Sequence, residues 1–438
     1  MKKKIRNILA AALSAVFVCG AFAACGGNEE SDAGEVDESG NTIVKIMFHV
    51  DAKSAEGVAY KKRVDAFNRA YAERKIKAQP QFKARSTGAS NYETELTNNK
   101  TEGTLADIIT FDAPNCAAYA NSGLLYDISS IVPQETQDDF ISLNKYNNKL
   151  YGLPIQESSA GFYYNKSIFR DAGVDVSGYT VENPWTFEQF REACQKIKDF
   201  GKVAVDMRID ATKDETAPYL LYPFIYAAGG SFASDDGLTA TGYFNSDKTY
   251  NGFNFIKGLI DDGYTSNSIG ATDFFTGKVG MYLSSGWTIP DLENDYKQTF
   301  PNRDAWGLLP YPMGEAKASA TGSWCFGITD NHHPDKSASK ELLLWMTTPE
   351  SAKEITDATG MIPARKSVET SYAKGSPEDV LLSQLKTTGR ARPATIAYPK
   401  FSSAFNLVIG GIKSGNDLRT LLNNNAGELQ TEMNKFKK

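Results

Sequence analysis

The stretch from Tyr146 to Phe169, YNNKLYGLPIQESSAGFYYNKSIF, constrains the fold of this chain more than any other segment. It contains two short apolar runs, Lys149–Ile155 and Gly161–Asn165, which the polar patch Gln156–Ser159 interrupts. Short apolar runs between polar turn residues are typical of strands. We therefore expect a chain that is extended, then broken, then extended again, as where a protein passes from one lobe into another.

The length of the chain also favours two lobes, because 438 residues exceed what one hydrophobic core usually serves. A content of 41% hydrophobic and 23% charged residues is ordinary for a soluble globular protein. The formal net charge is −6, and no basic stripe follows the N-terminus. Nucleic acid is therefore not an expected partner.

The N-terminus has the pattern of a secretion signal, predicted over residues 1–24. Lys2, Lys3, Lys4 and Arg6 precede an apolar run from about Ile8 to Ala24, which is too short and too abruptly ended for a mature spanning helix. Phe22-Ala23-Ala24-Cys25 is similar to a bacterial lipobox, although that pattern prefers Leu where Phe22 stands. We expect lipidation of Cys25; cleavage after Ala23, which would release a soluble protein, is the alternative.

Residues 25–41 are predicted to form an acidic, flexible tether behind the lipid anchor. A diacylglyceryl group supplies two chains, which is enough for stable membrane anchoring. Beyond Cys19 and Cys25, the cysteines Cys116, Cys194 and Cys325 are far apart and odd in number, so they predict neither a disulfide framework nor a metal site. This low cysteine content is in keeping with a Gram-positive cell surface.

The segment after the tether alternates strands and helices. Strands are predicted at 42–50, 76–82 and 105–111, with helices at 57–73 and 92–99 between them. This order predicts a parallel sheet with helices on both faces, in which ligands bind beyond the carboxyl ends of the strands. Five polar residues fall at those ends: His49, Asp51, Lys53, Asp112 and Asn115.

The later part of the chain continues the alternation. Thr186 and Gln189 form a capping-box pattern that predicts a helix from there to about Phe200. Further helices are expected at 218–230, 251–261, 334–347 and from about 416 to the end, and strands within 274–283, at 306–311 and at 323–329.

The opening stretch resembles the extracellular solute-binding proteins of the carbohydrate-binding, maltose-binding type (family 1) of ABC importers. The residues that carry this resemblance are Tyr146, Asn147, Lys149, Leu150, Pro154, Ile155, Tyr164, Asn165 and Lys166. It extends from about Thr42 to the C-terminus and includes the segments 183–190 and 361–365. It implies an α/β, two-lobe periplasmic-binding-protein fold (type II-like), each lobe a mostly parallel sheet flanked by helices, joined by a hinge. The N-terminal lobe would comprise 42–155 and 327–365, and the C-terminal lobe 156–326 and 366–438.

A sugar is held by a flat aromatic ring under its C–H face and by carboxylate, amide or guanidinium groups at its hydroxyl edge. In Ser285-Gly286-Trp287, Trp287 corresponds to the stacking tryptophan of the resembling sequences. Other candidates by resemblance or position are Tyr219, Tyr222, Trp324 and Asn406. For the aromatic residues, core packing is the alternative.

For the hydroxyl edge, Asp51 and Lys53 match acidic and basic residues that the family places after its first strand. Glu157 lies in the crossing stretch, and Arg365 and Arg392 are cleft or hinge candidates for which surface salt bridges are the alternative. After Asp112 this chain has Pro114-Asn115 where the resembling sequences have Asp-Arg, which weakens the case for maltose itself as the ligand.

The sequence lacks three common enzyme motifs: it contains no G-x-S-x-G, H-E-x-x-H or G-x-G-x-x-G. His332-His333 lacks companion ligands at recognisable spacing, so neither a metal nor an organic cofactor is expected. Asp112 and Glu157 could form the carboxylate pair of a glycosidase, but binding is the simpler role for them.

The resulting expectation is a substrate-binding lipoprotein of a bacterial ABC sugar importer, and not an enzyme. It would capture an oligosaccharide in the interlobe cleft, close about hinges near 155–160, 323–329 and 361–365, and dock on the permease as a monomer. Its place would be the extracellular face of the cell membrane. The alternatives are a secreted glycan-cleaving enzyme and a binding protein for another polar solute, such as a peptide or polyamine.

Overall fold

The computed structural model describes residues 35–85, 92–212, 214–368 and 370–437. The predicted signal peptide, the predicted lipidation site Cys25 and the tether as far as Gly34 lie outside these residues. The last part of the predicted tether is folded: Val36 bridges Thr42, and the Asp37 carboxylate accepts hydrogen bonds from the backbone N–H groups of Ser39 and Asn41. Among the helices in the described part, none is both long and apolar enough to cross a membrane.

The first half of the fold follows the predicted alternation of strands and helices. Its elements are β1 (Thr42–Phe48), α1 (Ala55–Ala70), η1 (Ala72–Arg74), β2 (Ile76–Phe82), α2 (Tyr92–Glu102), β3 (Ile108–Asp112), η2 (Ala113–Asn115), α3 (Cys116–Asn121), α4 (Gln134–Asp138) and β4 (Asn144–Tyr146). β1 pairs in parallel with β2 on one side and with β3 on the other. The predicted parallel arrangement of these three strands is therefore confirmed.

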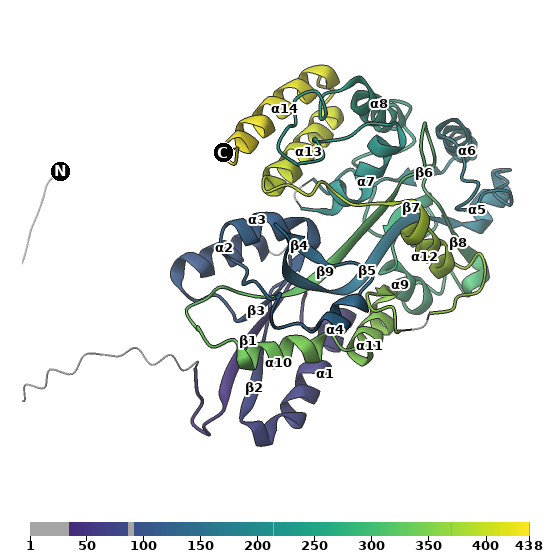
Figure 1. The fold of residues 1–438 in the computed structure, drawn as a ribbon. Coiled ribbons are helices and arrows are strands. Elements are labelled where there is room, and N and C mark those ends of the chain that lie inside the picture. Colours follow the sequence, from purple (N-terminus) through teal and green to yellow (C-terminus); the bar gives the residue numbers. More distant parts are fainter. Residues whose placement is uncertain (1–34, 86–91, 213, 369, 438) are drawn as a thin grey trace, which may run out of the picture. The chain divides into compact units, whose positions relative to one another are not determined.

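The stretch that was expected to break forms one continuous strand, β5 (Lys149–Asn165). The prediction of two strands separated by Gln156–Ser159 is wrong, because this polar patch has backbone partners on both sides. Residues Gln156 to Ser159 pair with Trp324 to Thr321 of β9 (Ser319–Ile328), and β10 (Ile362–Pro363) pairs with Gln156 and Glu157 from the other side. Polar side chains therefore remain inside a strand that runs from one half of the molecule to the other (Figure 1).

The strands form a mixed sheet in the order β2-β1-β3-β9-β5-β7-β6. β9 runs antiparallel to β3 and to β5, and β5 runs antiparallel to β7 (Val279–Ser285). Along this order, parallel pairing resumes between β7 and β6 (Val203–Asp206), and off it the short strand β11 (Gly389–Arg390) pairs in parallel with β9. The two central strands β5 and β9 thus connect a parallel group of strands in each half of the fold.

The second half contains the helices and strands that follow β5. They are α5 (Lys166–Asp171), α6 (Phe187–Asp199), α7 (Thr216–Ala227), α8 (Asp247–Asp261), α9 (Thr288–Asn294), η3 (Arg303–Ala305) and β8 (Trp306–Leu309). The predicted capping box is confirmed: the Gln189 backbone N–H donates to the Thr186 hydroxyl, and the Thr186 N–H donates to the Gln189 side chain. Such a box satisfies two backbone donors at the helix start and fixes where α6 begins.

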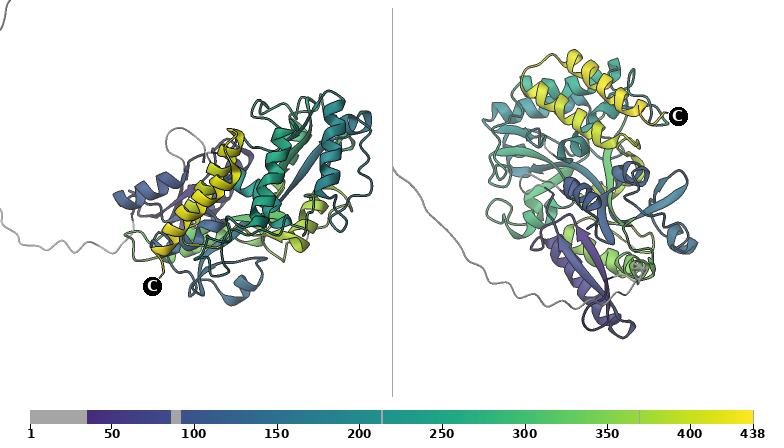
Figure 2. Two further views of the ribbon diagram at one scale, coloured as in Figure 1. Left: turned by 90° about the horizontal axis from the view of Figure 1, so that it is seen from above. Right: turned by 90° about the vertical axis from the view of Figure 1, so that its left-hand side faces the viewer.

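The last third of the chain contributes elements to both halves. α10 (Ser337–Met346) and α11 (Pro349–Thr359) contact α1 of the first half. α12 (Pro377–Thr387), β11 (Gly389–Arg390), α13 (Tyr398–Lys413) and α14 (Leu418–Asn434) belong with the second half. Figures 1 and 2 show α13 and α14 at the opposite end of the fold from β1 and β2.

Two large hydrophobic cores match these halves. One gathers β1, α1, α10 and the first part of β5, with side chains such as Phe48, Phe67 and Leu342. The other gathers the end of β5 with α6, α7, α8, α13 and α14, with side chains such as Phe162 and Phe224. Burial of apolar surface stabilises each half separately, so the boundary between them, crossed by β5 and β9, can carry polar groups.

Candidate functional site

A cavity of about 490 Å³ lies where the two halves meet. This volume is within the range of small-molecule sites. Its walls come from the loop before α1, the end of β3, the centres of β5 and β9, and the starts of α7 and α9. We call it the aromatic pocket, and the residues that define it are His49, Tyr219, Trp287 and Trp324 with the polar residues Asp51, Glu56, Arg85, Asp112, Gln156, Glu215, Asp291 and Arg392.

One wall of the aromatic pocket is a stack of His49 on Trp324. The two ring centroids are 3.4 Å apart and the ring planes differ by 3°. The His49 backbone N–H donates to the Thr110 hydroxyl at 3.0 Å, and its Nδ1 lies 3.1 Å from the same oxygen. Burial, with a smaller contribution from the positive charge of Arg85, lowers the pKa of His49 well below its usual value. His49 is therefore a neutral ring that holds Trp324 in place.

The opposite part of the pocket contains the exposed Trp287. This side chain is 40% exposed, although most large apolar side chains of the fold are buried. Its ring centroid lies 6.0 Å from that of Tyr219, with an angle of 44° between the planes. The Tyr219 hydroxyl donates to the Ser158 hydroxyl at 2.7 Å, which fixes the Tyr219 ring. Trp287 thus offers an accessible aromatic surface beside a fixed second ring.

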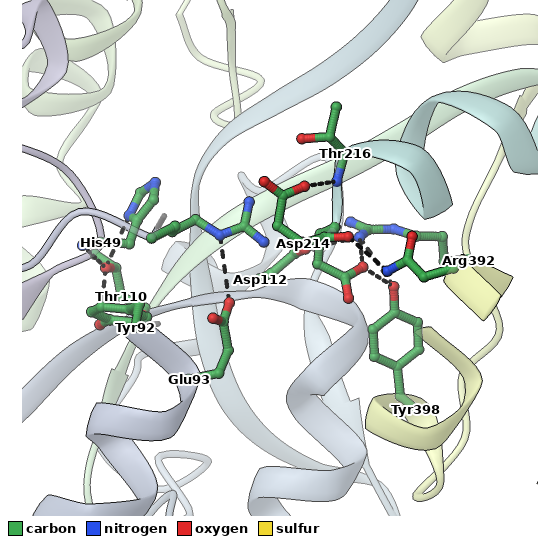
Figure 3. A network of polar contacts seen from close by, with 12 residues as sticks. His49, Tyr92, Glu93, Thr110, Asp112, Asp214, Thr216, Arg392 and Tyr398 are labelled. Carbon is green, nitrogen blue, oxygen red and sulfur yellow. Dashed lines mark hydrogen bonds and ion pairs between the residues drawn. The ribbon is translucent and has the colours of Figure 1, made fainter. Parts of the chain in front are cut away.

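A buried ion bridge spans the two halves (Figure 3). The Arg392 guanidinium donates to both carboxylate oxygens of Asp112, at 2.7 and 2.8 Å, and to Glu215 at 2.9 Å. The Tyr398 hydroxyl also donates to Glu215, at 2.6 Å. Asp112 ends β3 in the first half, whereas Glu215, Arg392 and Tyr398 belong to the second.

The surroundings of Arg392 keep it charged. Burial alone lowers the pKa of a guanidinium, but the charges of Asp112 and Glu215 outweigh this effect and raise the pKa of Arg392 well above its usual value. Removing one partner of such a pair leaves an uncompensated buried charge, which is strongly destabilising. The alternative weighed for Arg392, a surface salt bridge, is wrong, because its side chain is only 3% exposed.

The pocket also contains a carboxyl group whose pKa lies near neutral pH. Glu56 lies in the first turn of α1 and accepts a hydrogen bond from the Tyr60 hydroxyl at 2.5 Å. Burial raises the pKa of Glu56 to about 7. At a pH close to this pKa the second oxygen of Glu56 can either accept or donate a hydrogen bond. Nearby, the buried Gln156 Oε1 has no hydrogen-bond partner among the described residues, so it is an unsatisfied acceptor beside the pocket.

The structure brings seven of the predicted site residues together in the aromatic pocket: His49, Asp51, Asp112, Tyr219, Trp287, Trp324 and Arg392. Lys53 is exposed and is not among the residues that line this pocket. Nor does the structure place Tyr222 there: its ring is buried in the core of the second half, and its hydroxyl accepts from the Thr321 N–H at 2.8 Å and donates to the Arg390 carbonyl.

The remaining predicted residues lie elsewhere. Asn115 and Asn406 line a separate cavity of about 910 Å³ between α2, α3, α13 and α14. Glu157 lines a cavity of about 440 Å³ and accepts a hydrogen bond from the Ser142 hydroxyl. Arg365 pairs with Asp139 at 2.6 Å, away from all three cavities.

Sequence reasoning missed Arg85, Glu56, Glu215, Gln156 and Asp291. A signal existed for Arg85, since it follows β2 at the carboxyl end of a parallel strand, where ligand groups gather. Arg85 lies over Trp324, with its guanidinium carbon 4.9 Å from the ring centroid. Glu215 immediately precedes α7, and Asp214 accepts from the Thr216 N–H at 2.8 Å in the turn that carries it (Figure 3).

Metal ligation is not indicated in the part of the chain that the structure describes. No group of three or more His, Cys, Asp and Glu side chains there could hold a metal ion. Cys116, Cys194 and Cys325 are buried and free. What the pocket offers is two aromatic surfaces, carboxylates, an amide and two guanidinium groups.

Comparison with protein-family models gives a match over residues 62–381 to the model described as bacterial extracellular solute-binding protein. A putative binding protein of Brucella abortus is 26% identical over 62% of this chain, and the match spans 66% of that protein, just under two thirds of its length. A maltooligosaccharide ABC transporter solute-binding lipoprotein of Streptococcus pneumoniae is 22% identical over 75% of this chain and 77% of its own length.

Solved structures share the fold. The GacH receptor of Streptomyces glaucescens, determined unliganded and with acarbose, has a TM-score of 0.73 at 19% identity and covers 90% of this chain and 99% of its own. UgpB from Mycobacterium tuberculosis, in complex with glycerophosphocholine, has a TM-score of 0.73 at 19% identity, covering 91% and 100%. Likeness at this identity establishes the fold alone, and it confirms the predicted two-lobe α/β architecture.

Proposed function

The chain belongs to the family of bacterial extracellular solute-binding proteins, and from this membership we propose that it captures an oligosaccharide in the aromatic pocket for an ABC importer. The observation that carries the proposal is the pairing of exposed Trp287 with Tyr219 next to carboxylates from both halves. A sugar ring needs this combination, since its C–H face packs on an aromatic ring and its hydroxyls bond to polar groups.

The proposed ligand contacts follow from the positions of the side chains. Trp287 lies under a sugar ring, and Asp51, Glu56, Asp291 and Gln156 accept or donate hydrogen bonds at its hydroxyl edge. The maltooligosaccharide protein of Streptococcus pneumoniae and the acarbose-bound GacH receptor support a sugar as the ligand class. The family consists of binding proteins, and no catalytic step is proposed here.

Ligand capture would involve closure of two lobes. We place the N-terminal lobe at 42–155 and 327–365 and the C-terminal lobe at 156–326 and 366–438, so that β5, β9 and the segment at β10 are the three crossings. Because ligand groups come from both lobes, closure brings Asp51 and Glu56 toward Trp287 and Tyr219. Closed, loaded protein would then dock as a monomer on the permease.

The proposed location is the extracellular face of a bacterial cell membrane, Gram-positive in type, with lipidated Cys25 as the anchor. Support comes from the lipobox-like Phe22–Cys25 and from the streptococcal relative, which is named a lipoprotein. Two acyl chains on one residue give stable anchoring, whereas a single chain gives only marginal binding.

Another polar solute is the second candidate, and one observation favours it. The polar residues of the pocket include Asp51, Glu56 and Asp291 besides the bridge, and UgpB of the same fold is in complex with glycerophosphocholine. A cationic ligand such as a polyamine or a choline derivative would interact with these acids and with the Trp287 ring.

The deciding experiment is thermal unfolding of the purified protein against oligosaccharides, with peptides, polyamines and glycerophosphocholine as contrasting classes. A ligand at about 100 times its dissociation constant adds about 2.7 kcal/mol, which raises the midpoint by several degrees. We expect one sugar class to raise it, and Trp287→Ala to abolish this rise. Tyr243→Ala removes an equally exposed aromatic side chain that does not line the aromatic pocket and is the matched control. A shift only with a contrasting class overturns the sugar proposal.

A further inference from the structure

A second cavity, of about 440 Å³, lies directly beyond Arg392 from the aromatic pocket. Arg392, Gly322 and Ser323 line both spaces. Asp112 faces the aromatic pocket, and the next two residues, Ala113 and Pro114, face the second cavity. We call this space the adjoining cavity; its polar lining comes from Ser142, Asn144, Lys145, Glu157 and Thr321. Gln156 and Ser158 of β5 face the aromatic pocket whereas Glu157 between them faces the adjoining cavity, so the two spaces lie on opposite faces of the sheet, and Arg392 is part of the wall that they share beside β9.

Several contacts hold Arg392 in this wall. Both of its terminal nitrogens are bound by Asp112, and one of them also by Glu215 and, at 3.1 Å, by the Tyr398 hydroxyl. The guanidinium rests against the backbone of β9, where a Cβ on Gly322 would lie only 3.1 Å from Arg392 Nη2. The guanidinium carbon also lies 5.3 Å from the Tyr219 ring centroid. Both terminal nitrogens of this planar group are thus fixed, whereas its buried Nε has no hydrogen-bond partner among the described residues.

The adjoining cavity has polar groups that can bond to sugar hydroxyls, although no aromatic ring among the described residues lines it. Glu157 accepts from the Ser142 hydroxyl at 2.5 Å, and burial raises the pKa of Glu157 to about 7. Near neutral pH this carboxyl group can bond to a hydroxyl as acceptor or donor. Asn144, Lys145 and Thr321 add further polar groups. A ligand in the aromatic pocket reaches none of them while Arg392 stands between.

We propose that the Asp112–Arg392–Glu215 bridge sets the length of the captured oligosaccharide by closing the passage from the aromatic pocket to the adjoining cavity. This inference rests on the proposed sugar-binding function. A short oligosaccharide fills the aromatic pocket, and further units gain no contacts beyond Arg392. The bridge joins residues of both lobes, so the passage is closed in the closed form that retains the ligand.

The test measures dissociation constants by calorimetry for two ladders, from the disaccharide to the hexasaccharide, of α-1,4-linked glucose and of β-1,4-linked galactose. In the unmodified protein we expect affinity to stop rising once the aromatic pocket is full. The double variant Asp112→Asn with Arg392→Ala opens the passage and neutralises Asp112, while Glu215 keeps its hydrogen bond from the Tyr398 hydroxyl. It should bind the hexasaccharide about tenfold more tightly than the unmodified protein does, which corresponds to about 1.4 kcal/mol.

The matched control is Asp112→Asn with Arg392→Met, which removes the same charges but keeps a long side chain in the passage. It should retain the preference of the unmodified protein for short ligands. A second control, Arg365→Ala with Asp139→Asn, removes another interlocked ion pair that lies outside the cavities and should leave the length profile unchanged.

Three outcomes overturn the proposal. One is affinity in the unmodified protein that rises with every unit to the hexasaccharide, a measurement that needs no variant to fold. Another is an equal gain in the Ala and Met double variants. The third is an equal loss of affinity for ligands of all lengths in both double variants, since Arg392 would then bind the ligand itself. If no sugar of any length binds the unmodified protein, both the proposed function and the length proposal fail. If sugars bind without a length limit, only the length proposal fails.

Discussion

Gly286 and Gly360 lie in backbone contact where the two halves of the fold meet. A Cβ built on Gly286 would clash with the Gly360 carbonyl oxygen, and one built on Gly360 would be 2.5 Å from the Gly286 oxygen. Gly286 directly precedes Trp287, and Gly360 ends α11 in the left-handed conformation with φ of +69°. The position of Trp287 therefore depends on a contact that only two glycines allow.

Replacing Gly360 by Ala should destabilise the protein by about 1 to 3 kcal/mol, because it adds left-handed strain and a clash with Gly286. Ligand affinity should fall as well, since Trp287 is displaced. Gly427→Ala is the control: Gly427 is exposed in α14 with nothing near its Cβ position, so Ala should stabilise the helix by about 0.5 to 1 kcal/mol. Urea unfolding measures both. Equal effects of the two substitutions would contradict the contact.

The two tyrosines of α7 should separate binding from stability. Tyr219→Ala should weaken ligand binding at least about tenfold, because it removes the ring beside Trp287. Tyr222→Phe should leave affinity unchanged but cost about 1 to 3 kcal/mol, because the Thr321 N–H and Arg390 carbonyl lose their buried partner. Calorimetry and urea unfolding on the same preparations give both values. Loss of affinity in Tyr222→Phe would speak against the assignment of the pocket.

Glu157 should make stability depend on pH. Burial raises its pKa in the folded protein from 4.5 to about 7, so the folded state favours the neutral carboxyl. Its contribution is complete below about pH 4.5 and is lost as the pH rises through 7, by up to about 3 kcal/mol. The midpoint temperature of unfolding should therefore decrease as the pH rises from 5 to 8.

The variant Glu157→Gln is neutral at every pH and should flatten this profile, while exposed Glu428→Gln should not. A residual slope is expected in the Glu157 variant, because burial also raises the pKa of Glu56 to about 7 and of Asp206 to about 6. Profiles of wild type and Glu157→Gln that run parallel would show that Glu157 is not protonated in the folded protein.

Cys25→Ser should convert a membrane-bound protein into a released one. With the thiol gone no diacylglyceryl group can be attached, and the folded part of the chain has no membrane-spanning helix among its described residues. Phase partitioning in detergent distinguishes the two forms. Retention of the variant in the detergent phase would contradict anchoring through Cys25, and the buried Cys194→Ser serves as control.

Much of the fold was predictable because its signals are local. The family resemblance rested on residues around β5 and is confirmed by the family match over 62–381. The bounds of β2 and the capping box of α6 were predicted correctly, since strand alternation and helix capping depend on neighbouring residues. The polar patch of β5 was misjudged because its partners lie on β9 and β10, which sequence spacing does not reveal.

Partners that are distant along the chain also limit what the sequence predicts about the site. His49, Asp112 and Trp287 could be predicted, because carboxyl ends of strands and the Gly-Trp motif mark them. The sequence marks Arg392 as a cleft or hinge candidate but does not reveal its ion bridge, because its partners Asp112 and Glu215 are distant along the chain. Tyr219 and Tyr222 have similar sequence settings, but α7 is buried on nearly all sides, so periodicity cannot tell which tyrosine reaches the pocket.

The pairing of β3 with β9, such as Ile108 with Ile328, also determines how this chain can reach its native state. The core of the first half includes Phe326, Leu342 and Ile355, which the ribosome adds long after β1. Contacts of such high sequence separation slow folding, because loop-closure entropy is lost before they form. The N-terminal segment therefore cannot complete its structure while synthesis is under way, and an exported precursor would stay unfolded until translocation has delivered the last third of the polypeptide.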